Sequence, residues 1–327
     1  MTPTADEILE RAHVVALPMA VRFRGVEVRE ALLIDGPAGW GEFSPFVEYG
    51  PRESAAWLAS GLEAAFTGLP HAEGSVEVNG TVPAVPEVAD IAPVLERYPG
   101  VRTFKIKVAE PGQTLHDDIA RLAQVHHLRP DARLRVDANR AWSVDEAVEA
   151  ARAFVEVCEL EYIEQPCATA EELAEVRRRL AGTVGTAIAA DESIRRAEDP
   201  FRVAELGAAD VAVCKVAPLG GVGRLRGIVE KLGLDVTVAS ALDTAVGMDA
   251  GLVAAKLTGS RAAGLATQRL FAEDVAEPRK LIDGSLAITR TIPDPDRLHD
   301  LRATPERREW WFERVRKCLE FLKNGGK

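Results

Sequence analysis

The fold of this chain is decided by five apolar stretches that each end in charge: TFKIK (residues 103–107), RLRVDAN (133–139), EYIEQP (161–166), TAIAADES (186–193) and DVAVCK (210–215). They recur at intervals of roughly 24 to 30 residues, which is the length of one strand, one helix and their loops. Strands that are covered on both faces are apolar, and a barrel of parallel strands carries its polar groups at the carboxyl ends. The pattern therefore predicts an α/β fold with a (β/α)8-type, TIM-like barrel.

The barrel is flanked by segments of a different character. The repeat starts with SVEVNGTVPA (75–84) and closes with RAAGLAT (261–267). Ahead of it, three alternating stretches predict antiparallel strands, and RESAAWLASGLEAAFTG (52–68) predicts an amphipathic helix. We therefore expect an N-terminal α+β capping domain (1–75), a catalytic barrel (76–285), and a C-terminal segment (286–327) whose helix packs on barrel and cap.

Composition restricts the possible partners. The chain has 327 residues, a hydrophobic content of 47% and a formal net charge of −11. Nucleic acids and anionic membranes favour basic surfaces, so we expect neither as a partner, whereas a small anionic carboxylate remains possible. The four cysteines form no CxxC pair, the start is acidic, and no apolar run approaches about 18 residues. These features predict a cytoplasmic protein and leave its oligomeric state open.

Three carboxylates end consecutive predicted strands: Asp137, Glu164 and Asp191. In a barrel they converge on the mouth, where three like charges repel one another unless a cation lies among them. No His or Cys joins this set, so its ligands are hard oxygen atoms. They favour Mg²⁺, with Mn²⁺ as a possible substitute, over Zn²⁺.

Three lysines accompany these acids. Lys105 and Lys107 are two residues apart on one strand, so both point into the barrel, and Lys215 ends a strand four positions around it. A divalent cation and a second lysine lower the proton affinity of Lys107, which can then act as a neutral base. The combination predicts removal of an α-proton from a metal-bound carboxylate substrate.

The motifs KIK, VDANRAW, IEQP, ADES and CKVAPLGG, in this order, resemble the enolase superfamily, muconate-lactonising subgroup. The likeness covers nearly the whole chain and implies a modified (β/α)7β barrel. DANRAW, NGTVPA, ASALDTAVGM and the compact size resemble the o-succinylbenzoate synthases of menaquinone biosynthesis. These catalyse the syn dehydration of 2-succinyl-6-hydroxy-2,4-cyclohexadiene-1-carboxylate, which makes them carbon-oxygen lyases.

The resemblance also implies a role for each site residue. Asp137, Glu164 and Asp191 bind Mg²⁺, Lys107 removes the α-proton and then protonates the departing hydroxyl, and Lys105 lowers the pKa of Lys107. Lys215 stabilises the enediolate from the opposite face. The supporting and substrate-binding residues are Arg135, Asn139 and Ser240, with a cap loop near residues 22–25 and Phe46 closing over the substrate. The glycine-rich LGGVG (219–223) is interpreted as a helix-opening turn that could still touch an anionic substituent.

Three other functions fit parts of the pattern. An N-succinylamino acid racemase or dipeptide epimerase uses the same metal, with Lys107 and Lys215 as two bases. Dipeptide epimerases usually carry an acidic DxD at the eighth strand, where this chain has GLATQRLF (264–271). A non-catalytic barrel is disfavoured because no ligand or base is missing. A Schiff-base aldolase barrel needs one lysine but no triad of acids.

Overall fold

The computed structural model describes residues 3–23, 26–85, 87–195 and 199–323, without the side chains of residues 21–23. The N-terminal part is an antiparallel sheet of three strands in the order β1-β2-β3, namely β1 (Ala12–Phe23), β2 (Val26–Gly36) and β3 (Gly39–Phe43). Helices α1 (Ala5–Leu9) and α2 (Pro51–Leu62) pack beside it, and a π-helical turn (Glu63–Thr67) extends α2. The predicted antiparallel sheet is confirmed.

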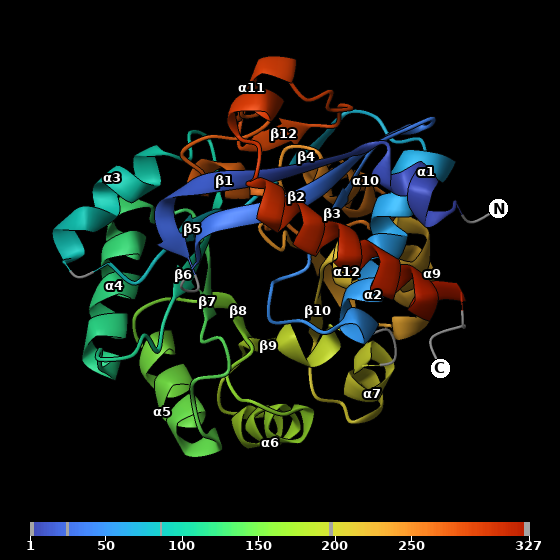
Figure 1. Cartoon of the computed structure of the whole chain (residues 1–327). Helices are drawn as coiled ribbons and strands as arrows, with labels where there is room; N and C mark the ends of the chain where they lie inside the picture. The colour runs from blue at the N-terminus through green and yellow to red at the C-terminus, as the bar shows by residue number, and fades with distance from the viewer. Residues whose placement is uncertain (1–2, 24–25, 86, 196–198, 324–327) are drawn as a thin grey trace.

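The centre of the molecule is a parallel sheet of seven strands in the order β11-β10-β9-β8-β7-β6-β5 (Figure 1). Its strands are β5 (Gly80–Val82), β6 (Thr103–Lys107), β7 (Arg133–Asp137), β8 (Leu160–Glu164), β9 (Ala187–Ala190), β10 (Val211–Cys214) and β11 (Asp235–Val238). Parallel bridges Ala239–Gly264 and Val78–Ala263 join its two edges. The predicted eighth position, RAAGLAT, therefore closes the barrel through a short bridge rather than a full strand.

Helices surround the barrel between successive strands. They are α3 (Ile91–Glu96), α4 (Leu115–Leu128), α5 (Val144–Val155), α6 (Ala170–Leu180), α7 (Asp199–Glu205), α8 (Val216–Leu219), α9 (Val222–Leu232) and α10 (Gly247–Thr258), with short 3-10 turns at Val88–Asp90, Glu192–Ile194 and Ala266–Leu270. Capping boxes at Thr114, Ser143 and Thr169 mark where α4, α5 and α6 begin. The Ser143 and Thr169 side chains each accept a hydrogen bond from a backbone N–H that the helix leaves unpaired, and at α4 the Asp117 carboxylate accepts one from the N–H of Thr114. One continuous apolar core fills the space between strands and helices.

One pairing was not predicted. The stretch expected as a single first barrel strand is divided into β4 (Ser75–Glu77) and β5. Strand β4 pairs antiparallel with β12 (Ser285–Ala287), so residues from the far end of the chain cover the base of the first barrel strand.

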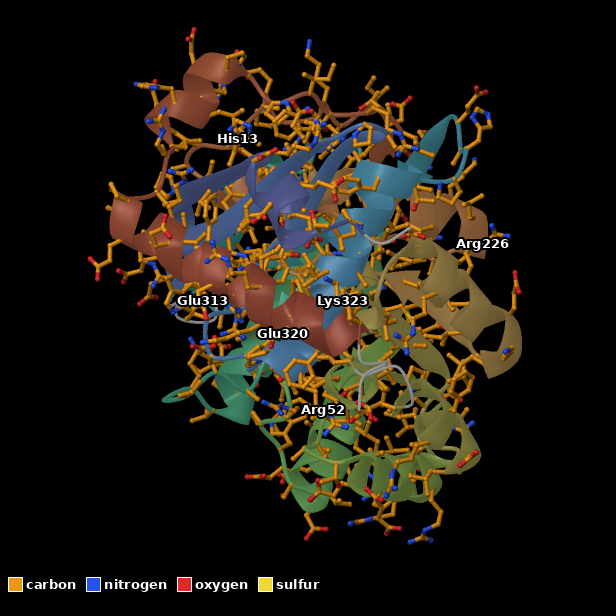
Figure 2. The ribbon with its side chains drawn as sticks, turned by 45° about the vertical axis from the view of Figure 1, so that its right-hand side comes forward. His13, Arg52, Arg226, Glu313, Glu320 and Lys323 are labelled. Carbon is orange, nitrogen blue, oxygen red and sulfur yellow. The ribbon has the colours of Figure 1, made fainter. Side chains whose placement is uncertain are left out.

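The C-terminal segment lies on the N-terminal part. After α11 (Pro295–Asp300), the long helix α12 (Pro305–Lys323) crosses the outside of the antiparallel sheet beside α2 (Figure 1). Its buried Trp311 meets the ring of Phe43 edge-on at 5.6 Å, whereas Glu313 and Glu320 are on its exposed side (Figure 2). The antiparallel sheet, α2 and α12 thus share one apolar core.

Candidate active site at the barrel mouth

The strand register brings the predicted site residues to one level of the barrel. Lys107 pairs with Asp137, and Asp137 pairs with Glu164, on the adjacent strands β6, β7 and β8. Asp191 follows the end of β9 directly, and Lys215 follows the end of β10. All five residues therefore stand at the carboxyl ends of parallel strands, as the spacing of the motifs predicted.

The lysines contact the carboxylates directly. Lys105 Nζ lies 2.7 Å from Glu164 Oε1 and 3.0 Å from Asp137 Oδ2, and Lys107 Nζ lies 2.5 Å from Asp137 Oδ2. Lys215 forms an ion pair with Asp191. Asp137 and Glu164 are completely buried, so these contacts occur where charges are weakly screened.

Burial and crowding of like charges change the protonation of this cluster. Burial, followed by the charge of Asp137, raises the pKa of Glu164 to about 7. Burial lowers the pKa of Lys105, but the charges of Asp137 and Glu164 outweigh it and the net pKa is raised. The cluster therefore contains more negative charge than it can hold without nearby cations.

The carboxylates fit a hard divalent cation. Among the described residues, no group of three or more His, Cys, Asp or Glu side chains is gathered closely enough to bind a metal as placed. The ammonium of Lys105 lies instead between Asp137 and Glu164 and stands in for a cation. Glu164 Oε2 is buried and has no hydrogen-bond partner in the described part of the chain. An orphaned carboxylate oxygen beside two further carboxylates fits Mg²⁺ or Mn²⁺ once the ammonium withdraws.

A cavity opens from this cluster toward the N-terminal sheet. Its walls include Lys105, Lys107, Asp191, Lys215 and Ser240 from the barrel, and Phe46, Tyr49 and Trp57 from the cap side. It offers about 50 Å³ of space, whereas small-molecule sites usually need several hundred. Side chains at the mouth must therefore move when a substrate enters.

Two predicted supporting residues lie behind this cavity. Arg135 is completely buried one layer below Asp137; its Nε donates to Glu161 Oε2 at 2.6 Å, and Nη1 donates to the Ala262 carbonyl at 2.7 Å. Asn139 Oδ1 accepts a hydrogen bond of 2.7 Å from Lys107 Nζ. Arg135 thus links neighbouring barrel strands, and Asn139 orients the ammonium of Lys107. Ser240 lines the cavity, whereas Arg135 and Asn139 lie outside its lining.

The sequence interpretation did not identify Arg195. Its Nη1 donates to the Tyr49 hydroxyl at 3.1 Å, and its Nη2 donates to Glu192 Oε1 at 2.8 Å, so it links barrel and cap at the cavity. The signal was present in ADESIRR, where a cation follows Asp191 by one helical turn. The other predicted cap-loop segment, residues 22–25, lies outside the residues whose side chains are described.

The glycine-rich turn after Lys215 is occupied by the protein itself. Glu63 accepts hydrogen bonds from the backbone N–H groups of Val222 at 2.6 Å and Gly223 at 2.9 Å. Gly221 has φ of 114°, a conformation that favours glycine, and a Cβ there would also collide with the Glu63 carboxylate. The turn thus receives a carboxylate from the π-helical extension of α2 and leaves no room there for a substrate anion.

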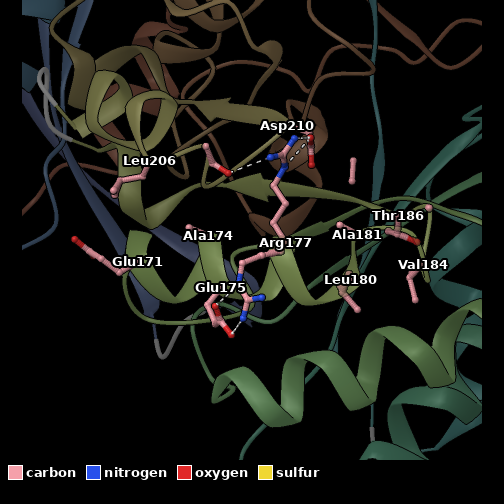
Figure 3. Close-up of a pocket in the computed structure, with 14 residues that line it drawn as sticks. Glu171, Ala174, Glu175, Arg177, Leu180, Ala181, Val184, Thr186, Leu206 and Asp210 are labelled. Carbon is pink, nitrogen blue, oxygen red and sulfur yellow. Dashed lines mark hydrogen bonds and ion pairs between the residues drawn. The ribbon is translucent and has the colours of Figure 1, made fainter.

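A second hollow lies at the opposite end of the barrel (Figure 3). It is lined by α6 and by the residues that lead into β9 and β10, at the amino end of these strands. Four of its charged groups are paired with one another, Arg177 with Asp210 and Arg178 with Glu175, each at 2.6 Å, and Glu171 is paired with Arg202. Because parallel barrels place their chemistry at the carboxyl ends, we assign no catalytic role to this hollow.

Family comparison fits the architecture in both parts of the chain. The family described as Enolase N-terminal domain-like matches residues 14–65, and the family described as Enolase C-terminal domain-like matches residues 89–292. The chain belongs to the enolase superfamily. The resemblance inferred from the five motifs is therefore confirmed.

Curated relatives narrow this superfamily assignment. An o-succinylbenzoate synthase of Mycolicibacterium smegmatis is 56% identical over 319 residues, which cover 97% of each chain. The o-succinylbenzoate synthase of Mycobacterium tuberculosis is 54% identical over 323 residues, covering 98% of this chain and 97% of the relative. Both alignments extend over nearly the whole chain, so they include the cap and the barrel of the enolase fold.

Solved enolase-superfamily structures share the fold at lower identity. The muconate lactonizing enzyme of Pseudomonas putida aligns with a TM-score of 0.71 at 22% identity, over 89% of this chain and 98% of its own. The muconate lactonizing enzyme of Pseudomonas fluorescens aligns at 0.73 and 24%, over 90% and 98%. The TIM-like barrel with an N-terminal capping part is thus confirmed.

Among the described residues, no helix combines the length and apolar character needed to cross a bilayer.

Proposed function

We propose that this chain is an o-succinylbenzoate synthase of menaquinone biosynthesis, a carbon-oxygen lyase. It dehydrates 2-succinyl-6-hydroxy-2,4-cyclohexadiene-1-carboxylate to o-succinylbenzoate. The observation that carries the proposal is the 54–56% identity to o-succinylbenzoate synthases along nearly the whole chain. The placement of lysines and carboxylates at one barrel mouth supports it independently.

The reaction needs a base and an acid on the same face of the ring. Lys107, as a neutral amine, takes the proton from the carbon that bears the carboxylate, and the same ammonium then returns it to the departing hydroxyl. One C–H bond and one C–O bond break, a ring double bond forms, and water leaves. Lys107 is held for this step by Asp137 and by Asn139 Oδ1.

Lys215 approaches from the other side of the barrel, because β10 lies four strands from β6. Its fixed positive charge stabilises the negative charge that develops on the substrate carboxylate, with a further cation–π contact to the ring. Lys105, next to Asp137 and Glu164, adds positive charge on the side of Lys107.

Asp137, Glu164 and Asp191 would hold the divalent ion, for which we propose Mg²⁺, with Mn²⁺ as a substitute. When bound, the ion supplies Lewis-acid charge that makes the α-proton of a carboxylate easier to remove. The orphaned Glu164 oxygen supports this assignment, as does the raised pKa of Glu164.

All four cysteines are free thiols, which supports the cytoplasmic location expected from the sequence.

The substrate carries a second carboxylate on its succinyl tail, and a cation on the cap side of the cavity fits it. We assign this role to Arg195, whose Nη1 reaches the Tyr49 hydroxyl across the mouth at 3.1 Å. Its Nη2 lies 2.8 Å from Glu192 Oε1 and 3.7 Å from Asp191 Oδ2, so the guanidinium stands between the carboxylate cluster and the cap. Ser240 lines the same cavity and is a further hydrogen-bonding group for the tail.

The rival function is racemisation of N-succinylamino acids, which present the same succinyl group and need bases on both faces. The deciding experiment follows o-succinylbenzoate formation by ultraviolet absorbance, with Mg²⁺ and with EDTA, beside a racemisation screen in deuterated water. We expect dehydration that EDTA abolishes and Mg²⁺ restores. Racemisation without any dehydration would contradict the proposal.

A further inference from the structure

Arg29 is a buried cation between the N-terminal sheet and the barrel mouth. It belongs to β2 and is only 3% exposed. Its Nε donates to the Leu242 carbonyl at 3.1 Å, and Nη2 donates to the Ala241 carbonyl at 3.3 Å and to the Ser44 carbonyl. A buried guanidinium must satisfy its donors, and here it does so with backbone carbonyls from two separate loops.

Those two loops form facing walls of the active-site cavity. Ala241 and Leu242 line it from the barrel, in the loop that follows β11. Phe46 lines it from the cap, two residues after Ser44, and its ring centre lies 4.5 Å from the guanidinium carbon of Arg29. The Arg29 side chain thus contacts both loops that form these walls.

The barrel loop needs such support. Leu242 has φ of 62°, in the left-handed region that branched, bulky residues rarely adopt. A strained residue of this kind persists only when its surroundings hold it. The Arg29 hydrogen bond to its carbonyl supplies one restraint, and the bond from the Asp243 N–H to Ser240 Oγ at 2.9 Å supplies another.

We propose that Arg29 is a positioning residue of this active site. It fixes the cap loop that carries Phe46 and the barrel loop that carries Leu242 at one spacing, and so sets the shape of the cavity that receives the substrate. It acts through those residues and does not touch the substrate itself. The inference depends on the proposed function only for its activity assay.

The cap loop has a second anchor, which keeps it attached when Arg29 is altered. Arg314 of α12 donates to the carbonyls of Phe46 and Tyr49, both at 2.7 Å. A conservative change at Arg29 therefore alters the spacing between the walls rather than detaching the cap.

The test compares R29K with R307K. Lysine keeps the charge of Arg29 but cannot span both loops. Arg307 is the matched control, because it binds Glu30, the neighbour of Arg29 on β2, at 2.8 Å without contacting either wall. We expect R29K to raise KM about tenfold or more with a smaller change in kcat, as small misplacements of a site do, and R307K to stay within about twofold of wild type.

Amide hydrogen exchange provides a readout that needs no turnover. We expect faster exchange in residues 240–244 and 44–49 of R29K, and unchanged exchange there in R307K. A wild-type KM together with unchanged exchange in R29K would overturn the inference. Failure of R29K to fold would also overturn it, because Arg29 would then be needed for folding rather than for positioning the site. A wild-type protein without dehydratase activity would instead refute the proposed function, and the exchange comparison would still test Arg29.

Discussion

At the residue scale, the site depends on carboxylates that cannot all remain charged without a cation. Asp137, Glu164 and Asp191 come from three neighbouring strands, and two of them are completely buried. The lysines balance their charge in this structure. We propose that a divalent ion held by these carboxylates would take over this task and leave Lys107 available as a base.

Asp191→Asn removes one of the charges that we propose to hold the metal, while it keeps the shape of the side chain. We expect the Mg²⁺ concentration for half-maximal activity to rise by at least about tenfold, because a neutral amide is a weaker ligand for a hard cation. A metal titration of activity measures this, with the exposed Asp131→Asn as control. An unchanged metal requirement would exclude Asp191 from the ligand set.

Arg195→Met tests the residue that sequence interpretation missed. Loss of a charge-assisted hydrogen bond to the succinyl carboxylate typically costs about 1.5 to 3 kcal/mol, so KM should rise about 10- to 100-fold, with kcat less affected. Arg202→Met, on exposed α7, is the control. If KM is unchanged in Arg195→Met, the tail carboxylate is bound elsewhere.

At the element scale, the most predictable features were the barrel strands and their end residues. Apolar runs that end in charged residues indicate buried parallel strands. Both faces of such a strand are covered by other parts of the protein, so only its ends contact solvent or substrate. The β4–β12 pairing escaped prediction because two three-residue strands, distant in the chain, have almost no local pattern. Arg29 escaped because its role depends on how the cap meets the barrel, which no local spacing encodes. The spacing of Arg195 from Asp191 places it near the site but does not reveal its hydrogen bond to Tyr49 of the cap.

Glu63→Ala removes the carboxylate that caps α9. The expected result is a loss of about 1 to 2 kcal/mol in the free energy of unfolding, since two backbone N–H groups at the helix start lose their acceptor. Chemical denaturation checks this, with the exposed Glu149→Ala as control. Equal stability of both variants would show that water replaces the cap without cost.

At the scale of the whole molecule, cap and barrel act as one unit because charged residues of the cap are buried against barrel loops. We propose the division into a cap (1–75), a barrel (76–285) and a C-terminal segment (286–327), with α12 joining the last to the first. Glu42 of β3 illustrates the coupling: it accepts hydrogen bonds from the N–H groups of Thr244 at 3.0 Å and Gly247 at 2.9 Å.

The Glu42 contact makes stability depend on pH. Burial, then the charge of Asp243, raises the pKa of Glu42 from its ordinary 4.5 to about 7, against the opposing effect of Arg29. The folded protein therefore holds an extra proton between pH 4.5 and 7, and its stability falls as pH rises through that window. Glu42→Gln should show a smaller decline in unfolding free energy from pH 5 to pH 8 than wild type. An equal decline would assign the pH dependence to other groups.

The most direct measurement of the central claim is the rate of o-succinylbenzoate formation by Lys107→Ala at saturating Mg²⁺, beside wild type and the exposed Lys231→Ala. A positioned base contributes about 10² to 10⁴ in rate, so Lys107→Ala should lose at least that factor while its circular dichroism stays that of the wild type. Lys231→Ala should retain full activity. Turnover by Lys107→Ala near the wild-type rate would contradict the account.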